Sequence, residues 1–363
     1  MVMGSGWLKS RIAGALYGGA IGDALGGAVE GWSLDLVHKV HGGPVQDLLP
    51  YVRINKDTVG PVDNNEIRAP AGRTTDDTHF KNLLCQAILK KGGRVSAEEF
   101  AAELKPNDSH AFIIMRQALL RLESFRHLYR AERMGQPHIS VTDNAAHHGG
   151  KGLPPANGAV MMMSPVGLLY PGNPRDAYLA GYEIACAIQQ GYSADLAGVV
   201  AAGVAAALVP DTDIRTVVAA MQEVAPDSAA ALFDETIAIV KEVKDFEDFR
   251  KAYQERLLIQ FLDPGETVAV AIGSLLMGKG DFESSTLNAV NFGRDCDSIA
   301  TVAGAIAGAF SGIDTIPAAW IETVDAAREE EPSQGDLAQG LYCALQNELS
   351  AARDWSDSYE PLL

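Results

Sequence analysis

The sequence predicts an all-α fold in a single domain that covers residues 1–363. Apolar residues recur with helical spacing along most of the chain. No convincing series of alternating polar and apolar residues indicates strands, and no long Ser- or Gly-rich linker divides the sequence. With 47% hydrophobic and 21% charged residues, the chain has the composition of an ordinary globular protein.

The first expected helix covers residues 14–27, where glycine recurs at every fourth position. A glycine inside a helix costs about 1 kcal/mol relative to alanine, so this stripe indicates that another backbone approaches closely. A similar small-residue helix is expected at 298–310. We expect the two helices to be central and to touch each other, although part of 14–27 would also fit a loop. The glycines of the first stripe are Gly14, Gly18, Gly22 and Gly26.

The remaining helices follow from the same periodicity. From Phe80 onward, Leu83, Leu84, Ala87 and Ile88 form one helical stripe. Further helices are expected at 112–129, 177–190, 195–209, 228–243, 267–278, 297–310 and 336–350.

Composition also limits the partners and the compartment. The formal net charge of −18 argues against a nucleic-acid partner. The longest apolar run, residues 196–209, is too short to span a bilayer. The four cysteines are scattered without a CxxC pair, which is typical of reduced thiols. We therefore expect a cytoplasmic protein that does not act on nucleic acid or insert into a membrane.

Two long polar connections stand out, at 40–74 and 137–158. Connections of this length in a compact domain are usually functional or mobile. The first could cover a cleft as a lid. The second carries His147 and His148, which are either incidental or in contact with substrate.

Acidic residues gather just before two of the expected helices. Thr75, Asp76, Asp77 and Thr78 precede the Phe80 helix, and Asp295, Asp297 and Ser298 precede the helix at 298–310. Helix capping explains one carboxylate or hydroxyl at each start, but each cluster offers at least three oxygen-bearing side chains. His79 follows the first cluster and would either support it or face the helix surface.

Carboxylates brought together in this number repel one another unless they are protonated or neutralised by cations. Oxygen ligands suit Mg²⁺, Mn²⁺ or Ca²⁺, and a pair of such ions can bind hydroxyls and activate a water. An EF-hand is excluded because Ile299 and Ala300 occupy its fifth and sixth positions. A haloacid-dehalogenase-type phosphotransferase would need a buried strand before Asp295, which the sequence does not indicate.

Three motifs resemble those of the ADP-ribosylglycohydrolases. They are GALYGGAIGDALGGAVE at 14–30, TDDT at 75–78 and GRDCDSIATVAGAIAGA at 293–309. A weaker fourth match is NGAVMMMSPVGLL at 157–169. The resemblance spans most of the chain and implies a compact orthogonal helical domain with a dinuclear metal cleft that holds two Mg²⁺ or Mn²⁺ ions.

The resemblance also assigns roles to particular residues. It makes Thr75, Asp76, Asp77, Asp295, Asp297 and Ser298 the metal ligands. Asn157 and Gly158 would line the ribose-phosphate part of the cleft. Glu30, Asp76 and Asp295 would be the catalytic carboxylates in cleavage of a glycosidic bond at the anomeric carbon of a ribose, through a transition state with oxocarbenium character.

Three departures from the family pattern bear on the substrate. Met162 stands where the family has an arginine, and Gly191 and Tyr192 lie roughly where many members have a Thr-His pair. Arg294 replaces the second glycine of Gly-Gly-Asp. It would either pair with Asp295 or bind an anionic group of the substrate.

These departures leave three functions open. The first is hydrolysis of an ADP-ribosylated protein or a related ADP-ribosyl compound. The second is hydrolysis of a small N-ribosyl metabolite or nucleoside-like substrate. The third is a catalytically silent member that binds ribose or ADP-ribose, which the complete set of carboxylates disfavours.

Overall fold

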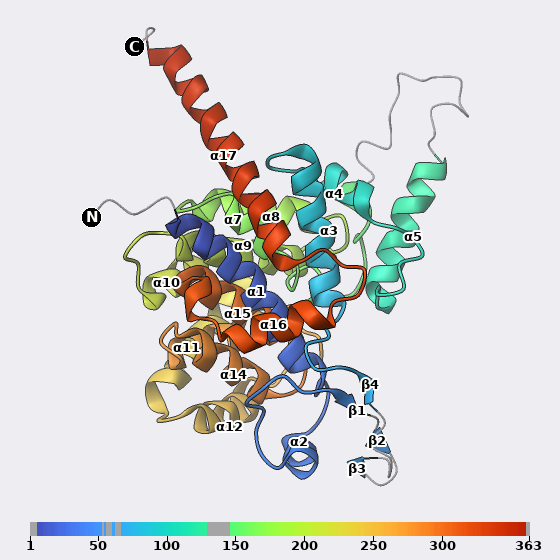
Figure 1. Ribbon diagram of the computed structural model, residues 1–363, viewed down its shortest axis with the longest axis vertical. Coiled ribbons are helices and arrows are strands. Elements are labelled where there is room, and N and C mark those ends of the chain that lie inside the picture. Colours follow the sequence, from blue (N-terminus) through green and yellow to red (C-terminus); the bar gives the residue numbers. More distant parts are fainter. Residues whose placement is uncertain (1–5, 53, 56–59, 62–66, 129–145, 361–363) are drawn as a thin grey trace.

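The structure is a computed structural model that describes residues 6–52, 54–55, 60–61, 67–128 and 146–360. The regular secondary structure of its described part is almost entirely α-helical, as the sequence predicts (Figure 1). The two central helices are α1 (Trp7–Gly27) and α15 (Cys296–Ser311). They are buried along most of their length and lie in the middle of the helical body.

The predicted contact between these two helices is confirmed. Gly14 lies against Gly308 and Gly18 against Gly304, so the helices run antiparallel. A Cβ atom at Gly18 would stand well inside van der Waals distance of the Gly304 carbonyl oxygen and 3.0 Å from the Phe282 ring. The glycine stripe therefore allows backbone-to-backbone packing. At its end, Gly26 faces the backbone of Asp297 and places the start of α15 beside the end of α1.

The other expected helices are all present, with ends that differ by a few residues, and α17 runs further than predicted and projects from the body (Figure 1). Several shorter helices were not predicted, among them α2, α10, α12, α14 and α16. The bounds are α2 Leu34–His41, α3 Asp76–Lys91, α4 Ala97–Glu103, α5 Ile113–Leu128, α7 Ser164–Leu168, α8 Pro174–Ala185, α9 Tyr192–Ala207, α10 Ile214–Val224, α11 Asp227–Glu242, α12 Phe246–Leu257, α13 Pro264–Met277, α14 Phe282–Phe292, α16 Ala318–Ala327 and α17 Gln334–Tyr359.

The connection at 40–74 contains two short antiparallel ladders. Strand β1 (Tyr51–Val52) pairs with β4 (Ile67–Ala69), and β2 (Ile54–Asn55) pairs with β3 (Gly60–Pro61). Just before β1, the Val45 N–H donates to Asn291 Oδ1 at 2.8 Å, and Trp320 Nε1 donates to Asp47 Oδ1 at 2.7 Å. This part of the connection is thus attached to α14 and α16, and its role as a lid stays a prediction.

The described helices include none with both the length and the apolarity to cross a membrane. All four cysteines are free; Cys85, Cys186 and Cys296 are buried and Cys343 is exposed. The predicted absence of a disulfide framework is therefore confirmed.

Candidate active site

The start of α3 is capped by residues other than the two aspartates of TDDT. Thr75 is the N-cap residue, and its side chain accepts a hydrogen bond from the Asp77 N–H at 3.3 Å. The fully buried Asp23 of α1 accepts from the Thr75 N–H at 3.0 Å and from the Thr78 N–H at 3.0 Å. Because the backbone donors are satisfied in this way, the carboxylates of Asp76 and Asp77 remain available to the cavity in front of the helix.

The start of α15 gives a similar result. Asp295 stands at the N-cap position, but its side chain makes no capping hydrogen bond. Its Oδ2 instead accepts a hydrogen bond from Asn157 Nδ2, which also donates to Thr267 Oγ1 at 3.2 Å. Helix capping therefore does not account for Asp295, and Asn157 fixes the orientation of its carboxylate.

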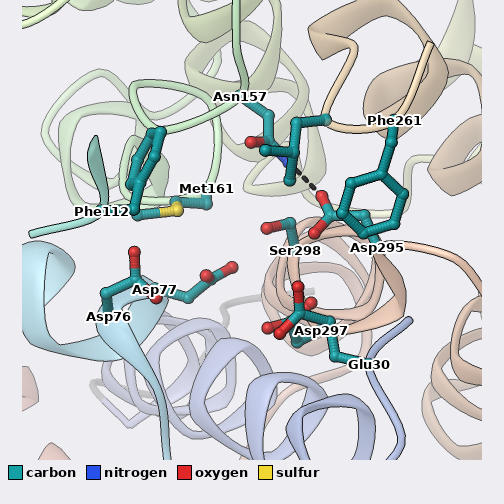
Figure 2. Close-up of a pocket in the computed structure, with 11 residues that line it drawn as sticks. Glu30, Asp76, Asp77, Phe112, Asn157, Met161, Phe261, Asp295, Asp297 and Ser298 are labelled. Atoms are coloured by element: carbon teal, nitrogen blue, oxygen red, sulfur yellow. Dashed lines mark hydrogen bonds between the residues drawn. The ribbon is translucent and has the colours of Figure 1, made fainter. Parts of the chain in front are cut away.

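The two acidic clusters meet in one cavity of about 210 Å³. Figure 2 shows Asp76 and Asp77 on one side of the cavity, with Glu30, Asp297 and Asp295 across from them. Carboxylate oxygens of Glu30, Asp295 and Asp297 lie within 4.8 Å of one another. The residues that line the cavity are Glu30, Asp76, Asp77, Phe112, Asn157, Met161, Phe261, Leu262, Asp295, Asp297 and Ser298.

Burial and mutual repulsion make these carboxylates difficult to ionise together. Burial, with the charges of Asp23 and Glu30, raises the pKa of Asp76 to about 7. Burial and the charge of Glu30 raise the pKa of Asp295 to about 7, against hydrogen bonds from Asn157 and Ser298 that lower it. The pKa values of Asp77 and Asp297 are raised well above the ordinary range, first by burial and then by neighbouring carboxylates.

The donor set fits a hard divalent cation. Asp77 Oδ1 and Asp297 Oδ1 are buried and have no hydrogen-bond partner in the described part of the chain. A buried carboxylate oxygen without a partner is costly, and oxygen atoms from carboxylates and hydroxyls are the ligands that Mg²⁺ and Mn²⁺ prefer. The Ser298 side chain stands beside the same carboxylates (Figure 2).

Two of the predicted substrate-binding residues lie close to aromatic residues that line the cavity. Gly158 packs closely against the Phe112 ring, and a Cβ atom added at Gly158 would stand only 2.8 Å from that ring. The Arg294 side chain forms an ion pair with Glu266 of α13 at 2.6 Å between Nε and Oε1, and not with Asp295, which was one of its two expected roles. Neither Gly158 nor Arg294 is among the lining residues, and their roles toward substrate stay predictions.

Sequence reasoning missed several residues of the site. Phe112, Met161, Phe261 and Leu262 form apolar walls, and no spacing in the sequence distinguishes them from core residues. Asp23 did leave a signal, since it is the one charged residue within an otherwise apolar stretch at 12–29. Such a residue indicates a buried hydrogen-bonding role.

The histidines named from the sequence lie outside the cavity lining. His79 bonds to Asp108 Oδ2 at 2.8 Å and to Glu331 Oε1 at 2.5 Å. His147 pairs with Glu98 at 3.0 Å, and the preceding residues 137–145 of its loop fall outside the described part of the chain. His79 therefore ties the start of α3 to the segments before α5 and α17.

Comparison with known proteins agrees with this geometry. The family model for ADP-ribosylglycohydrolase matches residues 6–354. The uncharacterized protein YegU of Escherichia coli is 26% identical over 88% of this chain and 93% of its own length. The ADP-ribosyl-[dinitrogen reductase] glycohydrolase of Rhodospirillum rubrum is 25% identical over 89% of this chain and 93% of its own length.

A solved structure supports the same fold. A chain of an ADP-ribosylglycohydrolase-related protein complex superposes with a TM-score of 0.63 and 21% identity, covering 93% of this chain and 99% of that one. The family model covers nearly the whole sequence, including all three motifs and every residue that lines the cavity. The chain therefore belongs to the ADP-ribosylglycohydrolase family.

Proposed function

We propose that this protein is a divalent-metal-dependent hydrolase that cleaves the glycosidic bond at the anomeric carbon of a ribose, in an ADP-ribosyl or related ribosyl compound. One observation carries the proposal. Five carboxylates from three separate parts of a glycohydrolase-family chain line a single cavity of about 210 Å³. A cavity with so much negative charge suits a substrate that offers hydroxyl groups and develops positive charge as its bond breaks.

The residues that would hold the metal are Thr75, Asp76, Asp77, Asp295, Asp297 and Ser298. The unpartnered oxygens of Asp77 and Asp297 support this assignment, because a cation would give both of them a partner. A bound pair of Mg²⁺ or Mn²⁺ ions would supply positive charge to orient ribose hydroxyls and to lower the pKa of a water.

The protein's own groups would divide the remaining work. Asn157 keeps the Asp295 carboxylate in one orientation through its amide hydrogen bond. The proton of the attacking water would pass to a carboxylate oxygen of Glu30, Asp76 or Asp295. The remaining carboxylates would stabilise the oxocarbenium character of the transition state by their charge, and Phe112, Met161 and Phe261 would limit access of bulk water.

The substrate class has two candidates. The R. rubrum relative is named for action on an ADP-ribosylated protein, which makes such a protein the first candidate here. A smaller ribosyl compound is the second, favoured by the small cavity and by its aromatic walls. Met162, at the position of the family's arginine, is fully buried, so it offers no contact to an anionic substrate group.

Product release from a panel of substrates tests the proposal. The panel contains ADP-ribosylated arginine and serine peptides together with small N-ribosides, each with Mg²⁺ or Mn²⁺. We expect ribosyl product from at least one class, and loss of that activity in Asp295→Asn. Asp281→Asn is the matched control, because Asp281 caps α14 and asparagine caps equally well. Equal activity in Asp295→Asn and the wild type would contradict the assignment of the site.

A further inference from the structure

Arg294 has an unusual backbone conformation for its residue type. Its φ is 61°, in the left-handed region that favours glycine. A bulky residue held at positive φ is strained, and such strain tends to persist where the side chain has a function.

The side chain of Arg294 joins three parts of the site region. Its Nε contacts Glu266 Oε1 at 2.6 Å, and Glu266 is only 2% exposed. Its Nη2 donates to the Ile259 carbonyl at 2.8 Å, and its guanidinium lies 5.8 Å from the Phe261 ring centre. A charge-assisted pair with a buried carboxylate is a strong and directional anchor.

The segment held by these contacts is 258–263, which connects α12 to α13. It carries Phe261 and Leu262, and both line the cavity. Phe261 is 44% exposed, so little of its position is set by burial. Figure 2 shows the Phe261 ring beside Asp295, across the cavity from Phe112.

We propose that Arg294 is a positioning residue, which together with Glu266 holds the 258–263 segment so that Phe261 forms a wall beside Asp295. This wall favours ligands that carry a flat aromatic ring, such as a nucleobase. An aromatic face packs well against a planar ring, and a second aromatic wall is present at Phe112. The ring preference rests on the proposed function, whereas the positioning role of Arg294 does not.

Amide hydrogen exchange tests the positioning role without any substrate. We expect Arg294→Gln to raise exchange in 258–262 about tenfold, with α15 unchanged. Arg294→Gly should loosen the same segment although it relieves the backbone strain, and Arg294→Lys should restore part of the protection. Arg256→Gln is the control, because Arg256 pairs with two exposed glutamates on the surface. Unchanged exchange of 258–262 in both Arg294→Gln and Arg294→Gly would overturn the positioning role.

Calorimetric binding of two probes tests the ring preference. ADP-ribose contains an aromatic base and ribose 5-phosphate does not. In the presence of Mg²⁺ we expect Phe261→Leu and Arg294→Gln each to weaken ADP-ribose binding about tenfold. Neither substitution should change the binding of ribose 5-phosphate. Arg294→Lys should bind ADP-ribose more tightly than Arg294→Gln does. Equal losses for both probes would overturn the ring preference. Wild-type protein that binds neither probe would overturn it together with the proposed function, while the exchange result would still decide the role of Arg294.

Discussion

Asp77 and Asp297 reach the same cavity from different helices, and each has one buried carboxylate oxygen without a hydrogen-bond partner. Asp77 stands in the first turn of α3 and Asp297 in the first turn of α15. The charge of Asp77 is among the causes that raise the pKa of Asp297, after burial. The fold thus holds like charges together at a cost that a bound cation would offset.

This cost predicts a stabilising substitution. In the metal-free protein, Asp297→Asn removes one of the opposed charges and keeps the shape of the side chain. We expect the free energy of unfolding in EDTA to rise by about 1 kcal/mol, measured by urea denaturation at pH 8. Asp281→Asn serves as the control, with no gain expected. A loss of stability in Asp297→Asn would indicate that this carboxylate makes a favourable contact in the metal-free state.

The packing of α1 on α15 predicts a large effect of one added methyl group. Gly18→Ala would drive its Cβ into the Gly304 carbonyl, and neither backbone can move without disturbing the helix pair. We expect a loss of about 3 kcal/mol in the free energy of unfolding. Gly43→Ala is the matched control, because a Cβ there meets nothing within 4 Å. Similar melting temperatures for the two variants would contradict the close approach.

Lys81 predicts a specific dependence of stability on pH. Its Nζ is buried beneath the acidic site, donating to Gln334 Oε1 at 2.8 Å and to the Leu16 carbonyl at 3.1 Å, and burial lowers its pKa from 10.5 to about 8. Between these two values the unfolded chain binds more protons than the folded one at this group. Its contribution to folding stability therefore rises with pH in this window.

The slope can be isolated by comparison with Lys81→Met. Between pH 8 and about 9.5 we expect the difference in unfolding free energy, wild type minus variant, to increase with pH by at most about 1.4 kcal/mol per pH unit. Chemical denaturation at half-unit intervals gives both curves. Parallel curves would mean that Lys81 keeps its ordinary pKa in the folded protein.

Asn157 is expected to affect activity more than stability. Asn157→Ala removes the amide that orients Asp295, so the turnover of any substrate found should fall about 10- to 100-fold. The melting temperature should fall only slightly. Asn347→Ala is the control, since the Asn347 amide donates to the Gly92 carbonyl on an exposed surface. Unchanged turnover in Asn157→Ala would exclude this positioning role.

The sequence predicts the central part of the fold because its signals are local. Glycines four residues apart mark one face of a helix, and the same pattern in α1 and α15 leads directly to their contact. The unpredicted helices α10, α12 and α14 are short, with 11 or 12 residues each, and α10 does carry an apolar stripe at Ile214, Val217, Val218 and Met221. Each begins at an aspartate that caps it, Asp213, Asp245 and Asp281 respectively, so capping signals could have located them.

The site is predictable only in part for a physical reason. Carboxylates at helix starts identify four of the five acidic residues that gather in the cavity, whereas Glu30 follows only from the family resemblance. The aromatic walls cannot be found in this way, because Phe112 and Phe261 stand outside the helix interiors and no periodic pattern fixes their direction. The partner of Arg294 depends on tertiary packing, which brings α13 against the start of α15.

The most direct measurement is the number of Mn²⁺ ions bound by EDTA-stripped protein, determined by electron paramagnetic resonance and calorimetry. The wild type should bind two ions, and the double variant Asp77→Asn with Asp297→Asn should bind none at the same concentrations while it remains folded. If the wild type bound no Mn²⁺, or if the double variant bound as many ions as the wild type, the result would contradict a metal-dependent hydrolytic centre in this cavity.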